Sequence, residues 1–162
     1  METTNLVLEF HKASGHPVGT KIKLLSKERM LQRIKFIQSE LNELKDAVEE
    51  DNLVEIVDAL EDIRYFVDGT HVEMGTNGIV DSIFHEIHYS NMSKFCSTEE
   101  EVEKSILNLS LLEPEEIFIY KEIAPLIYVI YDSNNKVRKG ITYRKPDLKP
   151  IIYANKDFEI DG

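Results

Sequence analysis

Two long runs of apolar residues at helical spacing constrain the fold of this chain more than any other feature. The first run predicts a helix from about Lys27 to Glu49, and its apolar stripe is Met30, Ile34, Ile37, Leu41, Leu44 and Val48. The second run predicts a helix that continues through Gly69 and stops at Gly75, and its stripe is Leu53, Ile56, Leu60, Ile63, Val67 and Met74. Because only "EEDN" separates the runs, we expect two antiparallel neighbouring helices.

The segments around these helices give weaker signals. Residues 10–26 carry two glycines and a proline, which predicts an irregular lead-in that ends at Ser26 as an N-cap. Asp51 is the expected cap of the second helix. A third helix is predicted over roughly Gly78 to Phe95. The letters "STEE" at 97–100 predict a Ser-x-x-Glu capping box, which would open a short helix with the apolar residues Val102, Ile106 and Leu109.

The last third of the chain is predicted to contain short strands. The candidates are "EIFIY", "LIYVIYD" and "KVRKGITY", with "DSNN" as the turn between the last two and Pro125 separating the first two. Residues 97–136 are expected to be a packing extension or a dimer arm. At 162 residues the chain suits one domain. We predict a mainly α fold, an antiparallel bundle with a four-helix core over about 26–110 and a short β-hairpin extension over about 115–153.

Five acids on the two long helices lack the basic neighbours that solvated helices usually provide. They are Glu40, Glu43, Glu55, Asp58 and Asp62, and none has a Lys or Arg three or four residues away. Other acids on these helices do follow the usual pattern, since Lys45 faces Glu49 and Glu61 faces Arg64. If antiparallel packing brings the two acidic rows together, their repulsion grows in the lower dielectric. The pattern therefore predicts a positive ligand between the helices rather than a merely solvated acidic face.

The oxygen-rich donor set indicates which ligand to expect. Clustered carboxylates suit Mg²⁺ or Mn²⁺, whereas the sequence has no cysteine pair for zinc and no calcium-binding loop. Mg²⁺ ions held by carboxylates commonly meet phosphate oxygens and activate water. The spacing alone thus favours a metal-dependent phosphate chemistry.

Composition excludes several other classes of protein. A net charge of −11 argues against binding to nucleic acid, which needs many Lys and Arg contacts. Cys96 is the single cysteine, so an internal disulfide cannot form. No run approaches the ~18 apolar residues of a membrane span, and the N-terminus lacks a basic start followed by an apolar run. We expect a cytoplasmic protein without a membrane partner.

The acidic segments resemble a known family. "SELNEL" and "VEIVDALEDIRYFVDGT" are similar to the Glu-x-x-Glu and Glu-x-x-Asp signature of the all-α nucleoside triphosphate pyrophosphohydrolases, the MazG-like and phosphoribosyl-ATP pyrophosphohydrolase-like superfamily. The resemblance implies Glu40, Glu43, Glu55 and Asp58 as metal ligands. Many relatives carry a second acid directly before the first Glu, where this chain has Ser39. We therefore expect Glu40 and Asp62 as the catalytic residues, with Asp62 as the substitute base.

Two later segments resemble one branch of small dimeric, dUTPase-like members. They are "FHEIHYSNMSKF" and "VRKGITYRKPDLKP". The resemblance implies a homodimer in which the partner chain contacts part of the nucleotide. The residues expected to bind substrate are Asn91, Lys94, Lys139, Tyr143 and Arg33. For Arg33 the alternative is a simple pair with a nearby acid, and for Tyr143 a buried strand position.

The resemblance implies Mg²⁺-dependent cleavage between the α- and β-phosphates of a nucleoside triphosphate, giving a monophosphate and pyrophosphate. A house-cleaning enzyme for dUTP or a non-standard nucleotide is the leading hypothesis. One alternative is the histidine-pathway hydrolase of phosphoribosyl-ATP, which the extra β tail disfavours. Another is a non-catalytic protein that binds a nucleotide or a partner through the same cleft, which Ser39 favours.

Overall fold

The computed structural model describes residues 2–155 of the chain, which contain six α-helices, a short 3₁₀ helix and two strands. The chain divides into two compact units, one made of Met1–Ser82 with Lys149–Gly162 and the other of Ile83–Leu148. The mainly α fold with a small two-stranded antiparallel sheet is confirmed. Whether both units form the single predicted domain stays a prediction.

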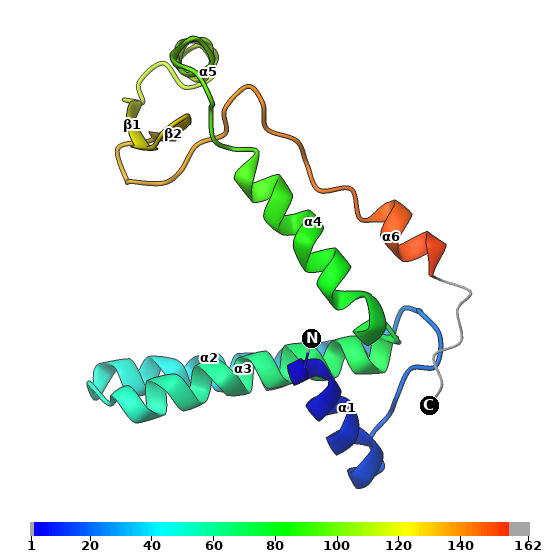
Figure 1. Ribbon diagram of the computed structural model, residues 1–162. Helices are drawn as coiled ribbons and strands as arrows, with labels where there is room; N and C mark the ends of the chain where they lie inside the picture. The colour runs from blue at the N-terminus through cyan, green and yellow to red at the C-terminus, as the bar shows by residue number, and fades with distance from the viewer. Residues whose placement is uncertain (1, 156–162) are drawn as a thin grey trace. The chain divides into compact units, whose positions relative to one another are not determined.

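Helices α2 (Lys27–Glu49) and α3 (Leu53–Met74) have the bounds that the sequence predicted. The Ser26 side chain caps α2 by accepting a hydrogen bond from the Arg29 backbone N–H at 3.1 Å. Gly75 ends α3 with φ 70°, the left-handed conformation that glycine adopts without a steric penalty. The two helices pack along each other, as Figure 1 shows. Periodicity and caps, which are local signals, were sufficient here.

Two predictions near these helices are wrong. The cap of α3 is Asn52, whose side chain accepts from the Glu55 backbone N–H, and Asp51 instead turns the chain with φ 52°. Residues 10–14, predicted as irregular, belong to helix α1 (Glu2–Ser14), which packs on α3. The buried face of α1 includes two polar residues, Thr4 and His11, beside Val7. Because polar residues interrupt its buried face, α1 has no apolar stripe long enough to predict the helix from the sequence.

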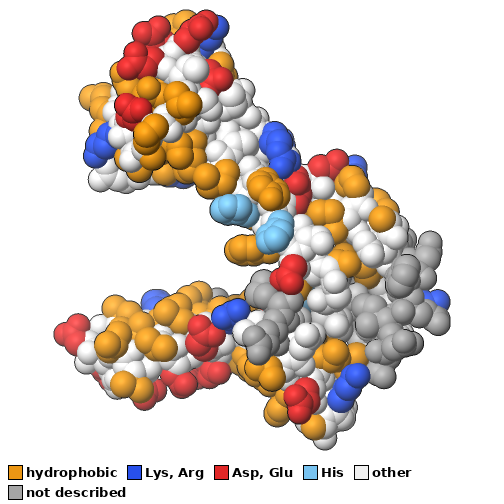
Figure 2. Space-filling model, in the orientation of Figure 1, with side chains coloured by type: hydrophobic (Ala, Val, Ile, Leu, Met, Phe, Trp, Pro, Cys, Tyr) orange, Lys and Arg blue, Asp and Glu red, His pale blue; other side chains and the backbone are white. Residues whose placement is uncertain are grey.

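Every second member of each predicted apolar stripe is exposed. On α2 these members are Ile34, Leu41 and Val48, and on α3 they are Leu53, Leu60 and Val67, with exposed fractions from 39% to 72%. The other members of both stripes are half-buried. Figure 2 shows hydrophobic side chains on the surface of this hairpin. The predicted four-helix core is therefore not completed by the contacts of α1, α2 and α3 alone.

The boundary between the two units falls near the start of α4 (Val80–Met92), after Ser82. The 3₁₀ helix η1 (Asn77–Ile79) leads into α4, which confirms the third predicted helix, although it ends three residues earlier than expected. Helix α6 (Lys149–Ala154) returns to the first unit. No helix among residues 2–155 is both long enough and apolar enough to span a membrane.

The second unit combines helix α5 (Glu99–Leu112) with the hairpin of β1 (Ile119–Ala124) and β2 (Ile127–Tyr131). The strands are antiparallel, and Ile119 pairs with Tyr131. The chain reverses at Pro125 and Leu126, so Pro125 separates the strands as predicted. The apolar core of this unit consists of Cys96, Val102 and Ile130, with Ile106, Leu109, Phe118 and Tyr128 packed against them.

Two details of this unit differ from the sequence prediction. The cap of α5 is Thr98, which accepts from the Glu101 backbone N–H, so the capping box lies one residue later than expected. The third predicted strand, 136–143, forms only a single bridge between Tyr131 and Val137. The turn before it is present, because Asp132 Oδ1 accepts from the backbone N–H groups of Asn134 and Lys136.

Candidate active site

The contact between α2 and α3 is fixed in register by stacked aromatic rings. Phe36 and Phe66 lie with ring centroids 5.3 Å apart, and the Arg33 guanidinium lies over both rings. One turn further along α2 is Glu40, and one turn back along α3 is Asp62. Because the helices are antiparallel, this register places the two acids opposite each other.

The carboxyl of Glu40 is influenced by acids on both helices. Partial burial raises the pKa of the Glu40 carboxyl, and the negative charges of Glu43, Asp62 and Asp58 raise it further. Two of these charges belong to the other helix. Glu55 lies one turn before Asp58 on the same helix, so it extends the acidic row toward the start of α3.

No Lys or Arg neutralises this cluster in the part of the chain that the structure describes. The basic side chain Arg64 is engaged elsewhere, with Glu61 at 3.5 Å and with the Thr3 hydroxyl at 3.1 Å. Glu43, Glu55, Asp58 and Asp62 are exposed and Glu40 is half-buried. Within residues 2–155 no three of the acidic, histidine or cysteine side chains converge closely enough to hold one ion. The cluster is open to solvent and leaves its charges unpaired.

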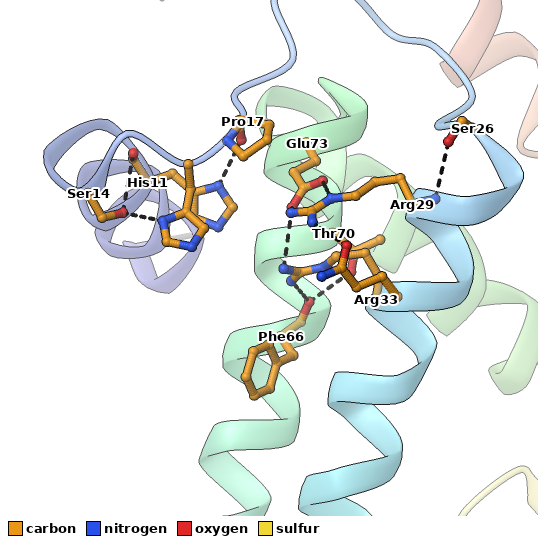
Figure 3. A network of polar contacts seen from close by, with 11 residues as sticks. His11, Ser14, Pro17, Ser26, Arg29, Arg33, Phe66, Thr70 and Glu73 are labelled. Carbon is orange, nitrogen blue, oxygen red and sulfur yellow. Dashed lines mark hydrogen bonds and ion pairs between the residues drawn. The ribbon is translucent and has the colours of Figure 1, made fainter.

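Arg33 has the environment of the alternative that the sequence left open, a pair with an acid. Its side chain is only 4% exposed, and it donates to Glu73, to the Thr70 hydroxyl and to the Phe66 carbonyl. These contacts are drawn in Figure 3, where Arg33 reaches from α2 to α3. Burial lowers the pKa of its guanidinium from the ordinary value, and the Glu73 charge opposes that change. Arg33 thus pairs with an acid, and its predicted contact with a phosphate stays a prediction.

Sequence reasoning missed Glu73 and Arg29, which complete this network. Glu73 is 2% exposed, and Arg29 binds both of its oxygens, at 2.7 Å from Nε and 2.6 Å from Nη2. This bond raises the pKa of the Arg29 guanidinium. The only local signal was that Glu73, near the end of α3, has no Lys or Arg three or four residues away. Its two partners lie 44 and 40 residues away in the chain.

The two later motif segments come together in the second unit. The Gly140 backbone N–H donates to the Lys94 carbonyl at 2.9 Å, and the Arg144 backbone N–H donates to the Ser93 hydroxyl at 3.0 Å. A Cβ on Gly140 would lie 2.8 Å from Cys96 Sγ, so only glycine allows this approach. The segments "SNMSKF" and "VRKGITY", quoted separately above, therefore form one continuous region.

The four remaining predicted substrate-binding residues lie in this region. Lys94 Nζ donates to Asn91 Oδ1 at 2.8 Å, and Lys139 Nζ lies 4.4 Å from the centre of the Tyr143 ring. Lys94 and Lys139 also line a cavity of about 450 Å³, together with Leu109, Glu113, Lys136, Val137 and Arg138. Arg138 is paired with Glu113 and Asp132. The cavity therefore retains three lysines that can meet an anion.

Comparison with known proteins agrees with the acidic motif. A family model described as phosphoribosyl-ATP pyrophosphohydrolase matches residues 7–91, just over half of the chain. The chain belongs to the phosphoribosyl-ATP pyrophosphohydrolase family. The match includes all five acids and the Phe36–Phe66 contact, which confirms the resemblance on which the metal ligands were chosen. The dimeric, dUTPase-like detail stays a prediction.

A viral relative extends the likeness. An uncharacterized protein of Acanthamoeba polyphaga mimivirus is 33% identical over 117 residues, which make up 63% of this chain and 47% of that protein. This chain therefore spans about half the length of the viral relative. The phosphoribosyl-ATP pyrophosphohydrolase family assignment identifies the chain with a family of pyrophosphohydrolases and does not by itself fix the substrate.

Proposed function

We propose that this chain is a Mg²⁺-dependent pyrophosphohydrolase that cleaves between the α- and β-phosphates of a nucleoside or deoxynucleoside triphosphate, including dUTP or a non-standard nucleotide. The supporting observation is the acidic cluster on α2 and α3. Partial burial raises the pKa of Glu40, the charges of three further carboxylates raise it more, and no described Lys or Arg pairs with any of them. Such a cluster costs stability unless a cation joins it.

The donor set fits a hard divalent cation. Glu40, Glu43, Glu55 and Asp58 would hold Mg²⁺ or Mn²⁺, since carboxylate oxygens are the ligands that these ions prefer. Three of the four side chains are exposed and free to rotate toward an ion. A bound ion would neutralise phosphate charge and lower the pKa of a water molecule.

The side chains of the chain itself supply the remaining chemistry. Asp62 accepts the proton of the water that attacks the α-phosphorus, and the bond from phosphorus to the bridging oxygen breaks as pyrophosphate leaves. Ser39 cannot take this role as a carboxylate would, which is why Asp62 is assigned. Lys94, Lys139, Asn91 and Tyr143 belong to the second unit, and their predicted roles in binding phosphate oxygens and the nucleoside stay predictions.

A homodimer is part of this proposal. The exposed members of both apolar stripes recur every seven residues on both α2 and α3, and an apolar seam with that spacing normally packs against other helices. Two copies of the hairpin would supply the four helices of the predicted core. We expect a dimer by light scattering, and Leu41→Arg with Leu60→Arg should yield a monomer. A wild-type monomer at micromolar concentration would contradict this assignment.

The test of activity is pyrophosphate release from a panel of canonical and non-canonical triphosphates, with Mg²⁺ and then with EDTA. We expect metal-dependent release that Glu55→Gln with Asp58→Asn abolishes. The matched control is Glu49→Gln with Glu61→Gln, which removes two exposed acids from the same helices outside the cluster. Full turnover in the Glu55 and Asp58 variant would refute the proposal.

Phosphoribosyl-ATP is the second candidate substrate, because the matching family carries its name. It has the same bond between the α- and β-phosphates, so the acidic cluster would act in the same way. Including it in the panel separates the two candidates. Metal-dependent nucleotide binding without any pyrophosphate release would instead support a non-catalytic binding protein, and Ser39→Glu would then be the first reversion to make.

A further inference from the structure

A second cavity lies in the first unit, one helical turn from the acidic cluster. It has a volume of about 200 Å³ and is lined by residues of α1, α2 and α3 and by His16. Its aromatic walls are Phe10, Phe36, Tyr65 and Phe66. Phe36 and Phe66 are the same stacked rings that precede Glu40 and follow Asp62 by one turn. A ligand in this cavity would therefore have its neighbouring groups beside the acids.

Aromatic walls from three helices favour a flat ring as the occupant. Phe10 meets Tyr65 edge to face, with ring centroids 5.8 Å apart, whereas Phe36 and Phe66 are stacked. Bases bind proteins by stacking on such side chains. Pockets for drug-sized ligands measure roughly 300–1,000 Å³, so this smaller cavity suits one ring system rather than a whole nucleotide.

One polar group of the cavity is fixed in orientation by the buried ion pair. Glu73 holds Arg29 through two hydrogen bonds, and the remaining Arg29 nitrogen, Nη1, donates to Gln32 Oε1 at 2.8 Å. A guanidinium only donates, so the atom of Gln32 that faces Arg29 must be its oxygen. The amide nitrogen of Gln32 is left as a donor, and within residues 2–155 no hydrogen bond from it is present.

We propose that this cavity is the nucleobase subsite of the proposed enzyme, and that the Gln32 amide selects the base by donating to a ring carbonyl. The inference rests on the proposed function, which places the phosphates at the acidic cluster. The occupant is a base with a carbonyl beside a ring nitrogen, and a cavity of this size suits the single ring of a pyrimidine. Adenine has no ring carbonyl that could accept from the Gln32 amide, so the subsite also disfavours phosphoribosyl-ATP.

The histidines of the cavity complete its polar edge. His11 Nδ1 lies 2.8 Å from the Pro17 carbonyl, which can only accept, so Nδ1 carries the proton. The Ser14 hydroxyl donates to the Phe10 carbonyl and thus accepts from His16 Nδ1 at 2.6 Å. In the neutral rings both Nε2 atoms are acceptors. Of the two, His16 is exposed and can accept from a base N–H, whereas His11 is buried.

The experiment measures binding and turnover separately. Binding of UMP, CMP and AMP and of inorganic tripolyphosphate is measured by calorimetry with Mg²⁺ for the wild type and for Gln32→Leu. We expect about tenfold weaker binding of the two pyrimidine nucleotides in the variant, the effect of one lost hydrogen bond, with tripolyphosphate binding unchanged. The matched control is Gln38→Leu, an exposed amide of α2 that bonds to Asn42.

The outcomes distinguish the two proposals. Equal binding of all three monophosphates by wild type and Gln32→Leu overturns the base subsite, whether or not the protein hydrolyses triphosphates. Gln32-dependent pyrimidine binding in a protein that releases no pyrophosphate supports the subsite and refutes the proposed reaction. Tighter binding of AMP than of UMP and CMP in the wild type also overturns the inference, because adenine has no ring carbonyl for the Gln32 amide.

Discussion

The two units bury different kinds of side chain. In the first unit the most buried residues include an Arg33–Glu73 ion pair and a hydrogen bond from Thr4 to Asp68, while apolar members of both helix stripes stay exposed. In the second unit a small apolar core of Cys96, Val102 and Ile130 is closed over by the hairpin and α5. Both units also leave apolar side chains exposed, since Leu111, Leu112 and Ile117 of the second unit are 71–78% exposed. The difference is that the first unit buries an ion pair and carries a cluster of unpaired acids, whereas the buried residues of the second unit include an apolar cluster.

The largest expected effect breaks the buried ion pair of the first unit. Glu73→Ala leaves Arg33 buried without a charged partner, so we expect a loss of about 3–5 kcal/mol in the free energy of unfolding. The second unit offers a matched control, because Glu113 pairs with Arg138 but is 44% exposed. Glu113→Ala should cost much less, because solvent screens an exposed ion pair. Urea unfolding followed by circular dichroism measures both losses. Equal losses would show that burial does not determine how much each ion pair contributes to stability.

Alanine substitutions at two glycines, one in each unit, should have a smaller effect on the free energy of unfolding. A Cβ on Gly140 would meet Cys96 Sγ at 2.8 Å and the Lys94 carbonyl at 3.0 Å. Because the sulfur is buried and the carbonyl is backbone, we expect Gly140→Ala to cost about 1–3 kcal/mol and to speed thiol labelling of Cys96. A Cβ on Gly69 would meet the ends of the Arg33 and His11 side chains. There the better helix propensity of alanine, about 1 kcal/mol, offsets part of the cost.

The glycine comparison has a clear contrary outcome. If Gly69→Ala lowers the free energy of unfolding more than Gly140→Ala does, the Arg33 guanidinium is held more rigidly than the backbone around Lys94. The labelling rate of Cys96 then provides an independent measure for the second unit, since this thiol is the only one in the chain.

Local signals predicted α2, α3 and the acidic cluster, and long-range contacts account for the failures. The bounds of α2 and α3 followed from periodicity, Ser26 and Gly75, all within a few residues of the helix ends. The third strand failed because Gly140 and Ile141 donate to Lys94 and Ser105 instead of to a neighbouring strand. Helix α1 was missed because its buried Thr4 and His11 find polar partners, Asp68 and the Pro17 carbonyl, that no local pattern reveals.

Arg33 illustrates the same limit at the candidate site. From sequence its two possible roles, phosphate binding and pairing with an acid, could not be separated, because the choice depends on Glu73, 40 residues away. The acids were easier to predict, since their unusual feature was the absence of cations within one turn. Patterns within one helix could be predicted from the sequence, whereas residue pairs that join two helices could be identified only from the structure.

The smallest expected effect concerns pH and the first unit alone. Burial lowers the pKa of His71, the nearby Asp68 charge opposes that change, and Nδ1 is 2.8 Å from the Thr76 hydroxyl. The folded state therefore favours the neutral ring. As the pH falls below the ordinary value of about 6.5, the unfolded chain takes up the proton first, so stability should decline with acidification. His71→Gln should lose less stability than the wild type between pH 7.5 and pH 5.5, measured by urea unfolding in EDTA. The control His85→Gln removes an exposed histidine of α4, and a wild-type slope that matches His71→Gln but not His85→Gln would exclude His71 as the group that titrates.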